Sequence, residues 1–214
     1  MLYDCRTTAD RDRGVAAAVE AAKSGELVVM PTDTVYGIGA DAFTPHAITA
    51  LHHARSVAQQ VPPPVLVGSR HTLDGLVYAL PRAARELADA FWPGALTLYV
   101  EHSPSLQWNL GETGGQVAVR MPLHPVALEV LREVGPMAVT TANKVGRPAP
   151  ETAEEARDQL EYAVRVYLEA GAAADPAPST IVDVTTDVAR VLRAGAIPLE
   201  KLRDVVPDLL GPED

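Results

Sequence analysis

The sequence contains little of what would place the protein in an oxidising compartment or a membrane. It has one cysteine, Cys5, among its 214 residues, so no internal disulfide is available and a reducing setting is expected. No apolar run approaches the roughly 18 residues that a membrane-spanning helix needs. The first residues also lack the basic start and apolar stretch of a secretory signal. We therefore expect a cytoplasmic protein with no membrane partner.

The common signatures of nucleotide and metal binding are also missing. Neither G-x-x-x-x-G-K-[ST] nor G-x-G-x-x-G occurs, and no pairing of cysteine with histidine suggests a metal site. The two tryptophans and two phenylalanines are too few to suggest a platform on which bases stack. A net charge of −10 argues against broad, sequence-independent binding of nucleic acid. It leaves room for a local basic pocket that holds a phosphate.

What the sequence does contain is a repeated alternation of helical and strand-like segments. Helices are predicted at 8–24, from Thr44-Pro45 onward, at 81–91, 125–133 and 198–205, and after a capping box at 152–155. Strands are predicted at 27–30, 65–67, 96–100, 117–120, 137–141, 164–168, 180–184 and 189–192. This alternation predicts one α/β domain over residues 1–206, with a twisted, mixed or mostly parallel sheet flanked by helices. A short acidic tail is predicted over 207–214.

Polar side chains gather where several predicted strands end, which is where open α/β sheets bind ligands. Thr32, Asp33 and Thr34 follow the first predicted strand, and Gly37 and Gly39 would let the backbone approach a ligand closely. Because threonine, aspartate and glycine also form turns, this stretch by itself supports a ligand site and a plain turn equally.

Three further stretches carry a similar ambiguity. Arg120 ends a strand and is suited to clamp a carboxylate or phosphate, or equally to form a surface ion pair. The strand end at 140–143 has two hydroxyls and an amide, which can form hydrogen bonds either with a ligand or with the loop's own backbone. Lys144 and Arg147 follow it and are suited to contact a phosphate. Trp92, before a proline–glycine turn, is interpreted as a packing anchor.

Six motifs, taken together and in order, resemble the YrdC-like family of threonylcarbamoyl-AMP synthases. They are P-T-D-T-V-Y-G-I-G at 31–39, W-P-G-A-L-T at 92–97, V-A-V-R-M-P-L-H-P at 117–125, T-T-A-N at 140–143, P-S-T-I-V-D at 178–183 and L-R-A-G-A-I at 192–197. The resemblance covers nearly the whole chain. It implies a twisted α/β domain with a large concave ligand cavity.

The resemblance also implies an activity. Family members convert L-threonine, bicarbonate and ATP into threonylcarbamoyl-AMP and pyrophosphate, and a downstream transferase complex uses the product to modify tRNA. Carried over by position, the threonine-binding residues are Thr32, Thr34, Arg120, Thr141 and Ser179, and the ATP-binding residues are Arg55, Asn143 and Arg193. No residue is expected to act as a nucleophile, because the carbamate attacks the α-phosphate itself. Mg²⁺ is expected to accompany ATP, with no metal ligands assigned to the protein.

One segment departs from the family pattern. The family has a lysine and an arginine that grip the ATP phosphates, but here Arg55 stands at the lysine position, and Val57 and Gln59 are uncharged. Leu66 also stands where some members carry a histidine near threonine. The altered 55–61 segment therefore favours a rival hypothesis, a divergent member that binds nucleotide or RNA with little or no synthase activity. Carbamoyl transfer to another acceptor is a third option.

Overall fold

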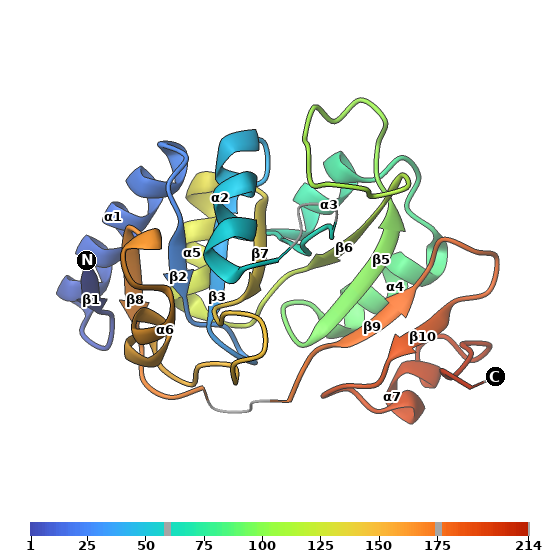
Figure 1. Cartoon of the computed structure of the whole chain (residues 1–214). Coiled ribbons are helices and arrows are strands. Elements are labelled where there is room, and N and C mark those ends of the chain that lie inside the picture. Colours follow the sequence, from blue (N-terminus) through green and yellow to red (C-terminus); the bar gives the residue numbers. More distant parts are fainter. Residues whose placement is uncertain (58–60, 174–176, 214) are drawn as a thin grey trace.

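The computed structural model describes residues 1–57, 61–173 and 177–213. Within them, a ten-stranded sheet runs through the whole molecule. Its strands are β1 (Leu2–Asp4), β2 (Val28–Met30), β3 (Gly37–Asp41), β4 (Val65–Leu66), β5 (Leu96–Glu101), β6 (Gln116–Arg120), β7 (Met137–Thr141), β8 (Val166–Glu169), β9 (Thr180–Asp183) and β10 (Arg190–Arg193). They lie in the order β1-β8-β2-β3-β7-β4-β6-β5-β9-β10. The N-terminal and C-terminal ends of the chain therefore lie at opposite edges of the sheet (Figure 1).

Most helices begin close to the positions that local signals predict. They are α1 (Thr8–Lys23), α2 (Pro45–Arg55), α3 (Arg70–Leu76), α4 (Arg82–Phe91), α5 (Pro125–Val134), α6 (Ala153–Leu160) and α7 (Leu199–Arg203), with a 3₁₀ turn, η1, at Glu161–Ala163. The Thr152 side chain accepts the Glu155 N–H at the start of α6, as the capping box predicts. Gly25 follows α1 with a φ of 78°, a conformation that favours glycine.

The sheet is mixed, as predicted. Four neighbouring pairs are parallel: β1 with β8, β2 with β8, β4 with β6 and β5 with β9. The other five neighbouring pairs, β2–β3, β3–β7, β4–β7, β5–β6 and β9–β10, are antiparallel. The prediction of a single α/β domain with helices flanking the sheet is confirmed. Among the described residues, no helix is long and apolar enough to cross a membrane.

Helices cover both faces of the sheet, so most strands are buried on both sides. Alternate residues of β2 show this directly. Val28 and Met30 belong to one apolar cluster, together with residues of α1 and α5, whereas Val29 belongs to the other, which contains residues of α2 and α6. Strands buried on both faces read as continuous apolar runs, which explains why short runs such as 27–30 predict them correctly.

Some helices and strands were not predicted from the sequence. The stretch 31–39 is not entirely a loop, because β3 begins at Gly37. A Cβ on Gly37 would lie 2.7 Å from a methyl carbon of Val139, so this glycine makes room for a side chain of the neighbouring strand. The strand β1 and the helix α3 are also not predicted. At the C-terminal end, the segment predicted as a tail contains packed residues, since Leu209 is buried and the Leu210 N–H donates to the Ala189 oxygen.

Candidate functional site

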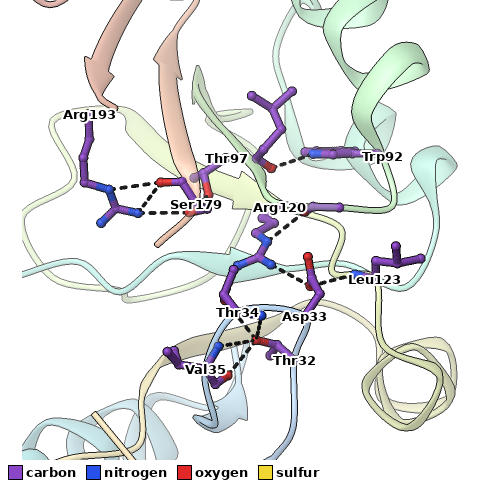
Figure 2. Close-up of polar contacts among 12 residues, drawn as sticks. Thr32, Asp33, Thr34, Val35, Trp92, Thr97, Arg120, Leu123, Ser179 and Arg193 are labelled. Atoms are coloured by element: carbon purple, nitrogen blue, oxygen red, sulfur yellow. Dashed lines mark hydrogen bonds and ion pairs between the residues drawn. The ribbon is translucent and has the colours of Figure 1, made fainter. Parts of the chain in front are cut away.

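Arg120, the last residue of β6, joins three of the sequence motifs. Its Nε–H donates to the Gly94 oxygen (2.9 Å), Nη1 to the Thr34 hydroxyl (3.0 Å) and Nη2 to the Asp33 carboxylate (2.6 Å), as Figure 2 shows. Only 7% of Arg120 is exposed. Arg120 therefore forms an ion pair, but a buried one, and the surface alternative is wrong. Gly94 fits this arrangement because a Cβ there would lie 2.6 Å from the Phe91 oxygen.

The two threonines of the first motif have different surroundings. The Thr32 hydroxyl donates to the Val35 oxygen (2.6 Å) and accepts the N–H groups of Thr34 and Val35 (3.2 Å each). Thr32 thus shapes the turn, which is the turn-forming behaviour that its residue type favours. The Thr34 hydroxyl accepts from Arg120 and lies 3.1 Å from that of Thr32. The turn interpretation of the motif is therefore confirmed at Thr32, and ligand binding by Thr34 stays a prediction.

Ser179 and Arg193 join the last two motifs to the second motif, W-P-G-A-L-T at 92–97. The Ser179 and Thr97 hydroxyls lie 2.8 Å apart. Arg193 donates Nε–H and Nη2–H to the Ser179 backbone oxygen (3.1 and 2.7 Å), and Nη2 also contacts the Ser179 hydroxyl at 3.0 Å (Figure 2). Burial, and to a lesser degree the positive charge of Arg120, lowers the pKa of Arg193. Arg120 is buried, whereas Arg193 is exposed, and their two positive charges favour an anion near them.

These side chains line one cavity of about 210 Å³. Six of the eight predicted site residues border it: Thr32, Thr34, Arg120, Thr141, Ser179 and Arg193. Leu66 lines it as well. The volume is below the roughly 300–1,000 Å³ of pockets for drug-sized ligands. The cavity therefore suits a small polar molecule, and the large concave cavity that the resemblance implies is not shown. A hollow of about 930 Å³ elsewhere, at Glu26, Arg157 and Tyr162, contains none of the predicted residues.

The other two predicted residues, Arg55 and Asn143, pair with each other. Arg55 donates Nε–H to the Asn143 backbone oxygen (3.0 Å) and Nη1–H to the Thr140 hydroxyl (2.8 Å). The Asn143 amide nitrogen donates to the backbone oxygens of Lys144 (3.1 Å) and Arg147 (2.8 Å). Asn143 thus orders its own loop, the alternative that the sequence left open. Burial lowers the pKa of Arg55.

Arg55 and Val57 line a second, smaller hollow of about 110 Å³ that also contacts Thr140 and Pro64. Thr140 and Pro64 border the 210 Å³ cavity too, so the two hollows are neighbours. Gln59, the other candidate position for the missing arginine, lies outside the described residues.

The chain is similar to known proteins over most of its length. The Sua5/YciO/YrdC family model, described as "Telomere recombination", matches residues 20–195. The chain belongs to this family. A Mycobacterium tuberculosis relative, provisionally named a threonylcarbamoyl-AMP synthase, is 56% identical over 204 residues, which is 95% of this chain and 94% of the relative. The threonylcarbamoyl-AMP synthase of Bacillus subtilis is 33% identical across 91% of this chain, and the match covers 57% of that protein.

Solved structures of the Sua5/YciO/YrdC family show the same fold. The crystal structure of Pyrococcus abyssi Sua5 complexed with L-threonine matches with a TM-score of 0.90 and 30% identity. It covers 99% of this chain, which spans 62% of that protein. Escherichia coli YciO matches with a TM-score of 0.82 at 22% identity, a likeness of fold alone, over 94% of this chain and 98% of that one.

Asp33 and Thr140 stand in stretches that the sequence indicated as possible ligand sites, but neither they nor Thr97 were among the assigned site residues. A signal for Thr97 exists, because it is a hydroxyl between Leu96 and Leu98, which are fully buried. A polar residue in a strand that is apolar on both sides needs a partner, and Ser179 supplies it. The interpretation of Trp92 as a packing anchor is confirmed, since it is 2% exposed and its Nε1–H donates to the Leu96 oxygen at 2.7 Å.

Proposed function

We propose that this chain is an L-threonylcarbamoyl-AMP synthase that uses L-threonine, bicarbonate and ATP. The single observation that carries the proposal is the buried Arg120, fixed at the edge of a small cavity whose other walls carry hydroxyls. Relatives named threonylcarbamoyl-AMP synthase and a Sua5 structure complexed with L-threonine support it. The product would supply a downstream transferase complex that modifies tRNA, in the cytoplasm.

The substrate carboxylate is assigned to Arg120. A guanidinium has five N–H groups, and the bonds to Gly94, Thr34 and Asp33 use three of them, one from each nitrogen. One N–H on Nη1 and one on Nη2 remain, which is the number that a bidentate carboxylate accepts. Thr34, Thr141 and Ser179 line the same cavity and supply hydroxyls for the amino group and the side-chain hydroxyl of threonine.

The reaction needs no nucleophile from the protein. The amino nitrogen of threonine takes up the carbon of bicarbonate with loss of water, which gives a carbamate. A carbamate oxygen then bonds to the α-phosphorus of ATP while the bond from that phosphorus to the bridging oxygen breaks, and pyrophosphate leaves. The chain's own contribution is to orient the two substrates and to place positive charge near the phosphates. Arg193 at the cavity and Arg55 at the neighbouring hollow are the residues assigned to that charge.

Mg²⁺ fits this site as an ion carried by ATP. Among the described residues, no group of three or more histidine, cysteine, aspartate or glutamate side chains is placed to hold a metal. Asp33, the acid beside the cavity, is already paired with Arg120. Mg²⁺ commonly binds through substrate phosphates and water, so a protein without a dedicated metal cage is compatible with it. When bound, the ion would neutralise charge on the phosphates.

The rival function, nucleotide or RNA binding with little synthase activity, rests on one observation. Arg55 already donates hydrogen bonds to Thr140 and Asn143, and Val57, which lines the same hollow, is uncharged. A grip on the triphosphate would then depend on Arg193 and on Lys144 or Arg147.

The decisive experiment incubates the protein with ATP labelled on its α-phosphate, bicarbonate, L-threonine and Mg²⁺. We expect equal amounts of pyrophosphate and a labelled threonylcarbamoyl-adenylate, and no product when threonine is omitted. Addition of EDTA should stop product formation but leave threonine binding intact, because the proposed threonine ligands include no metal. ATP binding without any adenylate at millimolar substrates would favour the rival function.

A further inference from the structure

Asp33 is the counter-charge of Arg120, but it does not line the cavity. Its carboxylate accepts from Nη2 at 2.6 Å, and the two side chains are 15% and 8% exposed, respectively. Residues on both sides of Asp33, Thr32 and Thr34, border the cavity, whereas Asp33 itself does not. In the view of Figure 2, Asp33 lies on one side of the Arg120 guanidinium, and Ser179 and Arg193, which border the cavity, lie on the other.

The same carboxylate oxygen makes a second bond. Asp33 Oδ1 accepts the backbone N–H of Leu123 at 2.8 Å in addition to the Arg120 bond. It thus ties the turn at 31–36 to the chain that leaves β6. A side chain as long as arginine has many rotamers, and a buried one needs all its acceptors in place to keep one of them. Thr34 and Gly94 fix two nitrogens of the guanidinium, and Asp33 fixes the third.

We infer that Asp33 is a positioning residue for recognition of the substrate carboxylate, acting through Arg120. This inference rests on the proposed function, which supplies the carboxylate. Asp33 accepts one N–H of Nη2 and leaves the other for the ligand. By holding the guanidinium in place, it lets this N–H and the remaining N–H of Nη1 donate together to the substrate carboxylate. Its contribution is position, which an amide oxygen in the same place would also provide.

Two substitutions separate position from charge. Asp33→Asn keeps an acceptor oxygen for Nη2 and for the Leu123 N–H but removes the charge. Asp33→Glu keeps the charge but adds one methylene, which displaces the acceptor. We expect threonine affinity, measured by calorimetry without ATP, to stay within about three-fold of wild type in Asp33→Asn and to fall by about ten-fold in Asp33→Glu, the size of one lost hydrogen bond to a charged group. ATP affinity should change little in either variant.

The reverse pattern, with Asp33→Glu close to wild type and Asp33→Asn weakened, would overturn the inference, as would unchanged affinity in both. Equal weakening in both would also overturn it. Asp41→Ala is the matched structural control, because Asp41 accepts from the Phe43 N–H and the Thr44 hydroxyl in a turn that contains no arginine. It should leave threonine affinity unchanged even if the melting temperature falls.

A double-mutant cycle tests whether Asp33 acts through Arg120. In an Arg120→Ala background, Asp33→Glu should reduce the affinity for threonine little further, because the guanidinium that Asp33 positions is absent. A full additional loss there would mean that Asp33 acts on the fold or directly on the ligand. If the wild-type protein binds no threonine at all, the proposed function fails and the inference fails with it. If the wild-type protein binds threonine and the Asp33 substitutions leave that affinity unchanged, the inference is overturned but the proposed function is not.

Discussion

The Nε–H of Arg55 donates to the backbone oxygen of Asn143 across 3.0 Å and so ties the end of α2 to the loop after β7. The guanidinium also donates to the Thr140 hydroxyl. The cation at the family's lysine position is therefore part of the scaffold of this chain. Any attempt to restore the phosphate grip has to keep Arg55 and add charge beside it.

Val57 is the position for that addition, because it lines the hollow that Arg55 borders. Val57→Arg should lower the Michaelis constant for ATP by roughly ten-fold or more, the value of one hydrogen bond between charged groups. The Michaelis constant for threonine should change little, since its proposed ligands border the other cavity. Val57→Gln, which adds length without charge, is the control. If the arginine and glutamine variants behave alike, the hollow is not a phosphate site and the rival function becomes the better one.

Arg120→Ala should weaken threonine by roughly ten- to a hundred-fold and ATP by much less, because a carboxylate loses two charge-assisted bonds that alanine cannot replace. Calorimetry with each ligand separately measures this. Arg82→Ala provides the control, since Arg82 is an exposed arginine paired with Glu86 four residues along α4. Equal losses for threonine and ATP would assign Arg120 a structural role.

His52 should make stability depend on pH. It is 5% exposed, its Nε2 has no hydrogen-bond partner among the described residues, and burial followed by the charge of Arg55 lowers its pKa. As the pH falls below about 6.5, the unfolded chain takes up a proton that the folded protein resists, so the free energy of unfolding decreases. His52→Leu should lose less stability between pH 7 and pH 5 than wild type in urea titrations. His53→Leu, whose side chain is exposed, is the control, and identical slopes for wild type and His52→Leu would contradict the prediction.

Gly195 should not tolerate a side chain. A Cβ there would lie 2.6 Å from the Ser179 oxygen and closer still to that of Pro178. Gly195→Ala should destabilise the protein by about 1–3 kcal/mol, a drop in melting temperature of roughly 2–12 °C. Gly75→Ala is the matched control, because a Cβ there meets nothing within 4 Å and alanine favours the helix α3. A melting temperature for Gly195→Ala equal to that of wild type would show that the 178–179 segment can move away.

Local signals determined most of the helices and strands. The helix α1 follows from its apolar spacing and from Gly25, and α6 follows from the capping box at Thr152, because caps and periodicity act between residues within a few positions of each other. β3 was missed since it contains Gly37 and Gly39, residues that rarely indicate a strand. Their presence is explained by Val139 of the neighbouring strand, about 100 residues away along the chain.

Through an ordered set of motifs, the sequence also indicated six of the residues that border the cavity, but not what those residues do there. The order of the strands placed Arg120 against Thr34 and Gly94, and Ser179 against Thr97. Only the tertiary structure decided that Asp33 pairs with Arg120 and that Arg55 donates to Asn143. The physical reason is that a hydrogen bond between groups 87 or 88 residues apart depends on how the sheet pairs its strands, and no short stretch of sequence encodes that pairing.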